Sequence, residues 1–292
     1  NSVTPLYLLG AASVLNIGLD LYFVRNLGWG LQGAAAATVI SQAVSGLGLG
    51  ICVWRKEPYF RFSLHGFLQE EKPMGEICRY SLMTSMQQSV MNFGILMVQS
   101  LVNSFGPAVM AAFAATVKID TFAYMPAQEF GNAYSIFISQ NFGAGKAERV
   151  KQGTGKAMAV SAVFCGAVSV LVFAFARFLM LIFVDAGESQ IIAIGMQYLR
   201  IEGAFYIGIG ILFLLYGYFR GVNRPGISLV LTVISLGTRV ALAYILAAIP
   251  TIGVTGIWWA IPIGWALADV TGFVLMRHDN EDSRKGKRRS KT

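Results

Sequence analysis

Asn16 and Asp20 combine a side-chain amide with a carboxylate at a spacing that suits ion binding. They lie four residues apart in an apolar run, so a helix places both side chains on one face. A carboxylate beside an amide oxygen can hold a proton or a sodium ion, and Thr38 in the next apolar run would add a hydroxyl. The alternative is structural, because Asn and Asp also join neighbouring membrane helices through hydrogen bonds.

Further polar residues interrupt the later apolar runs, where an ionisable side chain is costly and therefore a functional candidate. Lys118 and Asp120 are two residues apart on a predicted helix, so they point to different sides and cannot pair directly. The candidates for contact with a substrate are Gln88, Asn92, Lys118, Asp120, Glu129, Glu202 and Arg239. Structural ion pairing, with Glu202 and Arg239 as partners, stays open as the alternative for the charged members.

Other kinds of chemistry find no support. The three cysteines are scattered without C-x-x-C spacing and there are two histidines, so neither a zinc site nor a disulfide framework is expected. The segment Gly143–Lys146 fails the phosphate-loop pattern, which requires Gly at the position of Gln140 and Ser or Thr at that of Ala147. No nucleophile arrangement of Ser, His and Asp is evident. We therefore expect no enzyme, metal or cofactor, and transport driven by an ion gradient.

The elements that must position these residues are transmembrane helices. Apolar residues make up 55% of the 292 and charged residues 13%, about half the share in a typical soluble protein. A spanning helix needs about 20 mostly apolar residues, and strands with open edges do not occur in lipid. The sequence predicts an all-α membrane bundle of eight helices, at 6–25, 33–54, 77–103, 107–141, 154–183, 190–219, 225–248 and 254–276. Pro126 is expected to kink the fourth.

The positive charges predict the orientation. They gather in alternate loops and in the tail, which places both ends of the chain in the cytoplasm and leaves nucleic acid improbable as a partner. The loops on the outer side hold Arg25 and Arg177. The cytoplasmic loops and the tail hold Arg55, Lys56, Arg61, Lys72, Arg79, Lys146, Arg149, Lys151, Lys156, Arg220, Arg224, Arg277, Arg284, Lys285, Lys287, Arg288, Arg289 and Lys291.

One helix-pair pattern occurs twice. A helix starting at a proline, a short loop ending in G-x-x-G and a second helix occur from Pro5 through Gly30 and Gly33, and again from Pro225 through Gly253 and Gly256. Six helices complete the unit that ends at Arg277, but two complete the unit that ends at Arg55. We therefore expect a parent protein of two six-helix halves, of which this chain lacks the first four helices.

Three motifs carry a resemblance to a known family. The segment from Gln140-Asn-Phe to Gly143-Ala-Gly145 and Arg149, the Phe219-Arg-Gly segment before Pro225, and the Asn16–Asp20 pair resemble signatures of the multidrug and toxin extrusion (MATE) family. The resemblance spans about residues 4 to 277. It implies a partial two-lobe fold: 1–55 ending the N-lobe, a cytoplasmic connector at 56–74, a six-helix C-lobe at 75–277 and a basic tail at 278–292. The connector mixes charged residues with Phe and Leu, a composition that is compatible with an amphipathic helix at the membrane surface.

The resemblance also implies a function. Prokaryotic members similar to this chain bind their coupling ion, H⁺ or Na⁺, at an N-lobe site that Asn16, Asp20 and Thr38 match. The expected protein is a monomeric antiporter in a bacterial plasma membrane that exports drugs or other organic cations. Two alternatives remain: a flippase of the same superfamily acting on lipid-linked oligosaccharides, and a membrane scaffold that transports nothing.

Overall fold

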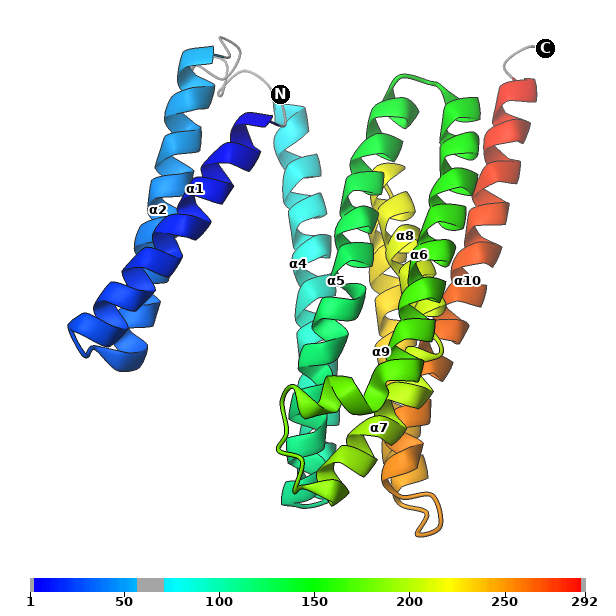
Figure 1. Ribbon diagram of the computed structural model, residues 1–292. Coiled ribbons are helices and arrows are strands. Elements are labelled where there is room, and N and C mark those ends of the chain that lie inside the picture. The colour runs from blue at the N-terminus through cyan, green and yellow to red at the C-terminus, as the bar shows by residue number, and fades with distance from the viewer. Residues whose placement is uncertain (1–2, 57–70, 290–292) are drawn as a thin grey trace. The chain divides into compact units, whose positions relative to one another are not determined.

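The computed structural model describes the backbone of residues 3–56 and 71–289 and the side chains of 4–55 and 74–278. The chain divides into two compact units, Asn1–Met74 and Gly75–Thr292. We describe each unit by itself (Figure 1). The predicted connector at 57–70 and the side chains of the basic tail lie outside the described residues.

The described part of unit 1 contains two packed helices, α1 (Val3–Asp20) and α2 (Gly30–Lys56). Immediately after Asp20 the backbone changes from an α-helix to a π-helix, η1 (Leu21–Asn26). Single-turn π segments inside helices are rare and often lie at functional sites. The change therefore draws attention to Asp20 independently of its side chain.

Unit 2 contains the remaining helices, and the described residues of the chain include no strand. Helices occupy all eight predicted spans. Among the described residues, six helices are long and apolar enough to cross a membrane, and a bent pair counts as a seventh. Helix α4 is not among these candidate spans, because its polar residues lower its mean hydropathy. The helices are α4 (Glu71–Asn103), α5 (Pro107–Gly143), α6 (Ala147–Leu181), α7 (Ser189–Gly203), α8 (Tyr206–Gly221), α9 (Pro225–Ala247) and α10 (Val254–Arg289).

The predicted single helix at 190–219 is instead two helices, α7 and α8, which meet at an angle of 52°. The backbone leaves the helical conformation at Phe205, with φ −112° and ψ 16°. The backbone groups at the break keep hydrogen bonds, from Phe205 N–H to the Glu202 carbonyl oxygen at 3.0 Å and from Gly208 N–H to the Phe205 carbonyl oxygen at 2.8 Å, as a membrane-spanning backbone requires. The break places Glu202 at the end of one helix and Tyr206 at the start of the next.

The irregular position in the long helices is not at the predicted proline. α5 continues through Pro126 as one element, whereas α6 contains a non-helical residue, Phe175, with φ −102° and ψ 15°. No proline accompanies that break, so the sequence offered no signal for it.

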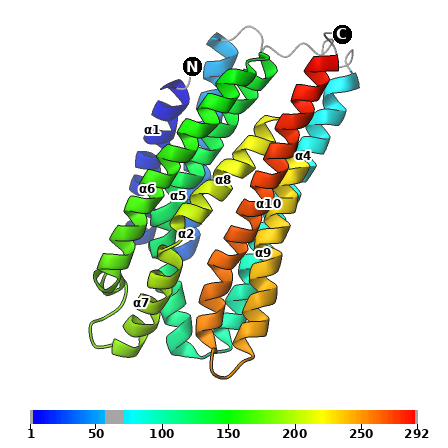
Figure 2. The same cartoon turned by 90° about the vertical axis from the view of Figure 1, so that its right-hand side faces the viewer.

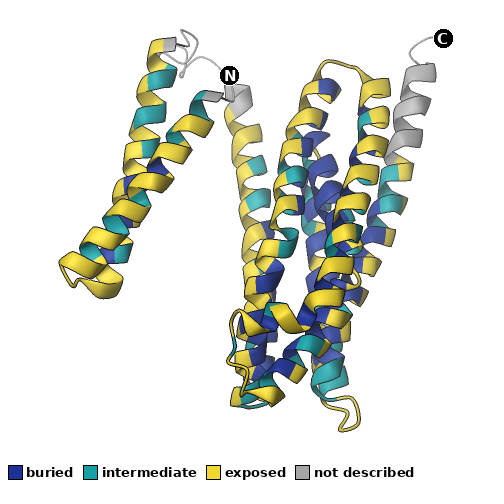
Figure 3. Cartoon of the chain, in the orientation of Figure 1, coloured by how far each residue is buried: buried dark blue, intermediate teal, exposed yellow. Residues whose placement is uncertain are grey.

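Helix α8 lies at the centre of unit 2, in contact with α5, α6, α9 and α10 (Figures 2 and 3). Its close approach to α5 depends on two glycines. A Cβ atom on Gly131 would lie 2.8 Å from the carbonyl oxygen of Phe213, and one on Gly217 would lie 2.5 Å from that of Gly131. Small residues allow membrane helices to approach this closely. The pair fixes α8 against α5, which carries Asp120.

The repeated helix pair has the same turn geometry in both places. Gly30 and Gly253, the first glycines of the two G-x-x-G loops, have φ of 53° and 52°. The second glycines are closely packed, because a Cβ on Gly33 would lie 3.0 Å from the nearest atoms and one on Gly256 only 2.5 Å away. Left-handed backbone and close contact both favour glycine.

Candidate functional site

The most enclosed acidic side chain in unit 2 is that of Asp120, on α5, which is 2% exposed. Tyr198 on α7 donates a hydrogen bond of 2.7 Å from its hydroxyl to Asp120 Oδ2. Tyr206 on α8 donates one to Asp120 Oδ1. The break between α7 and α8 therefore allows one carboxylate to accept bonds from both segments.

A second carboxyl group lies in the same cluster. Glu202, at the end of α7, is 3% exposed and lies beside Asp120 and Tyr198. Its Oε2 atom has no hydrogen-bond partner. The positive charge of Arg239 on α9 acts on both carboxyls, while its Nε also lacks a partner. We call Asp120, Glu202, Arg239, Tyr198 and Tyr206 the acidic cluster.

Aromatic rings pack against Tyr198 of the acidic cluster. Trp258 stacks on Phe113 with ring centroids 5.6 Å apart, and it meets Tyr198 edge-on at 4.8 Å. Phe113 also meets Tyr198 edge-on, at 5.7 Å. Apolar walls of this kind exclude water and so strengthen the electrostatic interactions of the charges inside.

A polar pocket of about 180 Å³ lies between α4, α5 and α8. Arg220 donates a hydrogen bond of 3.0 Å to the side-chain oxygen of Asn132, whose amide lies 3.3 Å from Glu129. Gln88, a predicted substrate contact, lines this pocket. The complete lining is Thr84, Gln87, Gln88, Met91, Gln128, Asn132, Phe213, Tyr216 and Arg220.

Two other predicted contacts lie elsewhere on the surface of unit 2. Lys118 is exposed, and its ammonium lies 5.8 Å from the ring centroid of Phe183. Lys118 and Asp120 thus face different surroundings, as their spacing predicted. Asn92 is exposed on α4 and does not line the polar pocket.

In unit 1, Asn16 and Asp20 are half-buried on α1. The Nδ2 atom of Asn16 and the Oδ1 atom of Asp20 are buried and have no hydrogen-bond partner. Thr38 is exposed and donates its hydroxyl hydrogen to the carbonyl oxygen of Ala34, 3.0 Å away. The amide and the carboxylate therefore keep unused bonding capacity, which burial makes costly.

The structure adds residues that the sequence reasoning did not select. Tyr198 lies four residues before Glu202 on α7, a spacing that could have identified it as a helical neighbour, whereas the break at Phe205 separates Tyr206 from Glu202. Asn132 and Arg220 come together only through the packing of α5 on α8. Asp269 on α10 is buried, with an unpartnered Oδ1, near Gly208 of α8.

With this geometry in view, three comparisons with known proteins agree. The MatE family model matches residues 82–245, more than half of the chain. The probable multidrug resistance protein YpnP of Bacillus subtilis is 29% identical over 280 residues, covering 95% of this chain and 61% of that protein. The probable multidrug resistance protein NorM of Thermotoga maritima is 26% identical over 262 residues, with 87% and 55% covered.

Solved structures have the same fold. A MATE crystal structure in complex with MaL6 matches with a TM-score of 0.86 at 25% identity, covering 94% of this chain and 62% of that one. A MOP superfamily transporter from Pyrococcus furiosus, described as having a binding pocket of reverse polarity, matches with a TM-score of 0.83 at 26% identity, with 92% and 60% covered. The chain spans about three fifths of the length of these proteins.

Proposed function

Because the chain belongs to the MatE family, we propose that it forms part of a secondary antiporter that exports drugs or other organic cations in exchange for H⁺ or Na⁺. The proposal places both ends of the chain, together with the basic loops between its helices, in the cytoplasm of a bacterial cell. It assigns transport rather than enzyme catalysis to the chain.

One observation carries the proposal: the acidic cluster contains two carboxyl groups but one guanidinium, so its fully ionised form has a net negative charge. Asp120 and Glu202 face a single guanidinium, that of Arg239. An uncompensated charge inside a membrane bundle is costly, so one bound proton or sodium ion is needed to balance the cluster. A site that must take up and release one cation is the feature that ion-coupled exchange requires.

Unit 1 supplies a second candidate for the coupling ion, Asp20 with Asn16. Their unpartnered atoms and the π-helix that begins at Leu21 support this assignment. Thr38 is the weaker member, because its hydroxyl hydrogen is already bonded within α2. Its oxygen keeps a lone pair for a cation.

The polar pocket supports contact with a substrate. Amides from Gln87, Gln88 and Gln128 line it beside Met91, whose flexible thioether suits ligands of varied shape. Polar side chains at this density are expensive within a membrane bundle, which favours a role beyond packing.

The proposal is tested with the intact transporter reconstituted in liposomes. Ethidium movement should follow an imposed pH or sodium gradient and should stop when the gradient is collapsed. Glu202→Gln should slow it by at least about tenfold, equivalent to roughly 1.4 kcal/mol in the activation barrier. The matched control is Glu188→Gln, in the exposed loop before α7.

Two failures are distinguishable. If neither gradient moves any organic cation, while a lipid-linked oligosaccharide crosses the bilayer, the flippase alternative replaces the antiporter. If ethidium is transported and Glu202→Gln matches the wild type, the antiporter stands and the acidic cluster is structural.

A further inference from the structure

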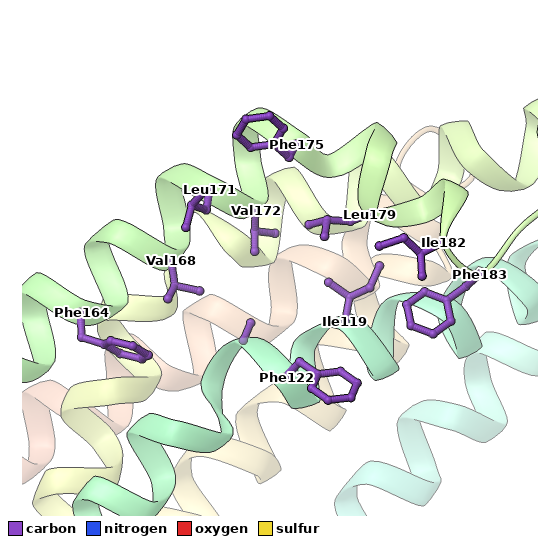
Figure 4. Close-up of a pocket in the computed structure, with 11 residues that line it drawn as sticks. Ile119, Phe122, Phe164, Val168, Leu171, Val172, Phe175, Leu179, Ile182 and Phe183 are labelled. Carbon is purple, nitrogen blue, oxygen red and sulfur yellow. The ribbon is translucent and has the colours of Figure 1, made fainter.

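An apolar groove on the surface of unit 2 takes no part in the proposed exchange. It lies between α5 and α6 and has a volume of about 560 Å³. Ile119, Phe122 and Ala123 line it from α5, and residues between Phe164 and Phe183 line it from the side of α6 (Figure 4). Every lining side chain is a hydrocarbon, so the groove offers nothing to a polar ligand.

The groove is elongated and open. Phe164 and Phe183 mark its ends, and the part of α6 from Phe164 to its last residue, Leu181, corresponds to roughly 26 Å of path. That path exceeds the thickness of one hydrocarbon leaflet, about 15 Å. Phe122 is 78% exposed and Ile182 is 70% exposed, so the groove is accessible from the surface. The non-helical residue Phe175 allows α6 to bend while its side chains continue along the groove.

A positive charge lies at one end of the groove. Lys118 precedes Ile119, and its ammonium lies near Phe183, which forms that end. Among the residues whose side chains are described, no carboxylate lies within ion-pair distance of this ammonium. A lysine on a membrane helix extends its flexible stem toward the headgroup region. The anion that a bilayer provides there is a lipid phosphate.

We propose that this groove binds a phospholipid, with an acyl chain along the groove and an anionic headgroup paired with Lys118. The hydrocarbon lining accounts for the chain, and the ammonium at one end accounts for the charge of the headgroup. Lipid recognition by basic residues beside membrane helices follows the same physical rule. This site is separate from the acidic cluster, and its test does not depend on transport.

The headgroup is tested by native mass spectrometry of the purified protein mixed with phosphatidylglycerol or phosphatidylcholine of identical acyl chains. Wild type should retain phosphatidylglycerol in preference. Lys118→Gln should reduce that preference about fivefold, the effect of one basic residue on an anionic lipid. Arg177→Gln, which removes an exposed charge from α6 outside the groove lining, should leave the preference unchanged.

The groove itself is tested by filling it. Ala123→Phe should abolish retention of both lipids, whereas Ala114→Phe, at an exposed position on the opposite face of α5, should not. Val168→Phe repeats the test from the α6 side if Ala123→Phe does not yield folded protein. Equal retention by the filled and control variants would overturn the proposal, as would a wild type that does not distinguish the two headgroups.

Discussion

Two independent observations, one from the sequence and one from the structure, indicate a functional role for Asp20. The sequence gives a carboxylate four residues from an amide, and the structure adds an unpartnered oxygen followed directly by a π-helix. Asp20→Asn keeps the shape of the side chain but removes its charge. We expect gradient-driven efflux by the intact transporter to be abolished while expression and drug binding persist.

The matched control is Asp185→Asn, which neutralises an exposed carboxylate between α6 and α7. Efflux and ligand binding are measured on the same preparations. Wild-type efflux from Asp20→Asn at equal protein levels would show that this aspartate serves as a hydrogen-bonding link between helices.

The tyrosines that bind Asp120 make a separate prediction about stability. Tyr198→Phe removes one donor from a buried carboxylate, which should cost about 1–3 kcal/mol in the free energy of unfolding. Tyr206→Phe should have an effect of the same sign. The loss is measured by unfolding the detergent-solubilised protein with heat or denaturant.

Tyr244→Phe serves as the control, because Tyr244 is an exposed tyrosine on α9. It should change stability little. Equal stability of the Tyr198→Phe variant and the control would mean that the bond to Asp120 contributes nothing to folding.

At the scale of helices, the contact between α5 and α8 depends on the absence of a side chain at Gly217. Gly217→Ala inserts a methyl group 2.5 Å from the Gly131 carbonyl oxygen, where the backbone cannot yield freely. Overpacking of this kind costs about 1–3 kcal/mol. Thermal unfolding of the purified protein should show the loss.

Gly155 on α6 provides the opposite case, since no atom lies within 4 Å of a Cβ placed there. Gly155→Ala should therefore stabilise the protein by about 0.5–1 kcal/mol, because alanine loses less freedom in a helix. The two substitutions are chemically identical, so a shared sign would contradict the packing argument.

The helices also show what the sequence can predict and what it cannot. Helices lie at all eight predicted runs, because bilayer thickness imposes a length that hydropathy reveals, although α4 is less apolar than the others. No proline accompanies the break at Phe205 or the non-helical Phe175, so neither has a local signal in the sequence. The acidic cluster depends on that break: Asp120 and Glu202 were recognised as costly charges, but their meeting through Tyr198 and Tyr206 required the fold.

At the scale of the whole molecule, the distribution of charge over the turns predicts how the helices are oriented in the membrane. In unit 2, the α4–α5 and α9–α10 turns lie at one end and the α5–α6 turn at the other (Figure 1). The α5–α6 turn is followed by Lys146, Arg149 and Lys151, and basic loops remain in the cytoplasm during membrane insertion. The end that carries Ser104 and Thr251 should therefore face the outside of the cell.

Accessibility of single cysteines to a membrane-impermeant maleimide tests this orientation in intact cells. Cys52 and Cys78 are first replaced, because neither is fully buried, whereas Cys165 is enclosed. Ser104→Cys and Thr251→Cys should be labelled directly, since both positions are exposed. Glu148→Cys, also exposed but at the other end, should be labelled only after the membrane is permeabilised. The reverse pattern would invert the bundle, and the charged turn after α5 would then have crossed the membrane against the bias that normally retains it.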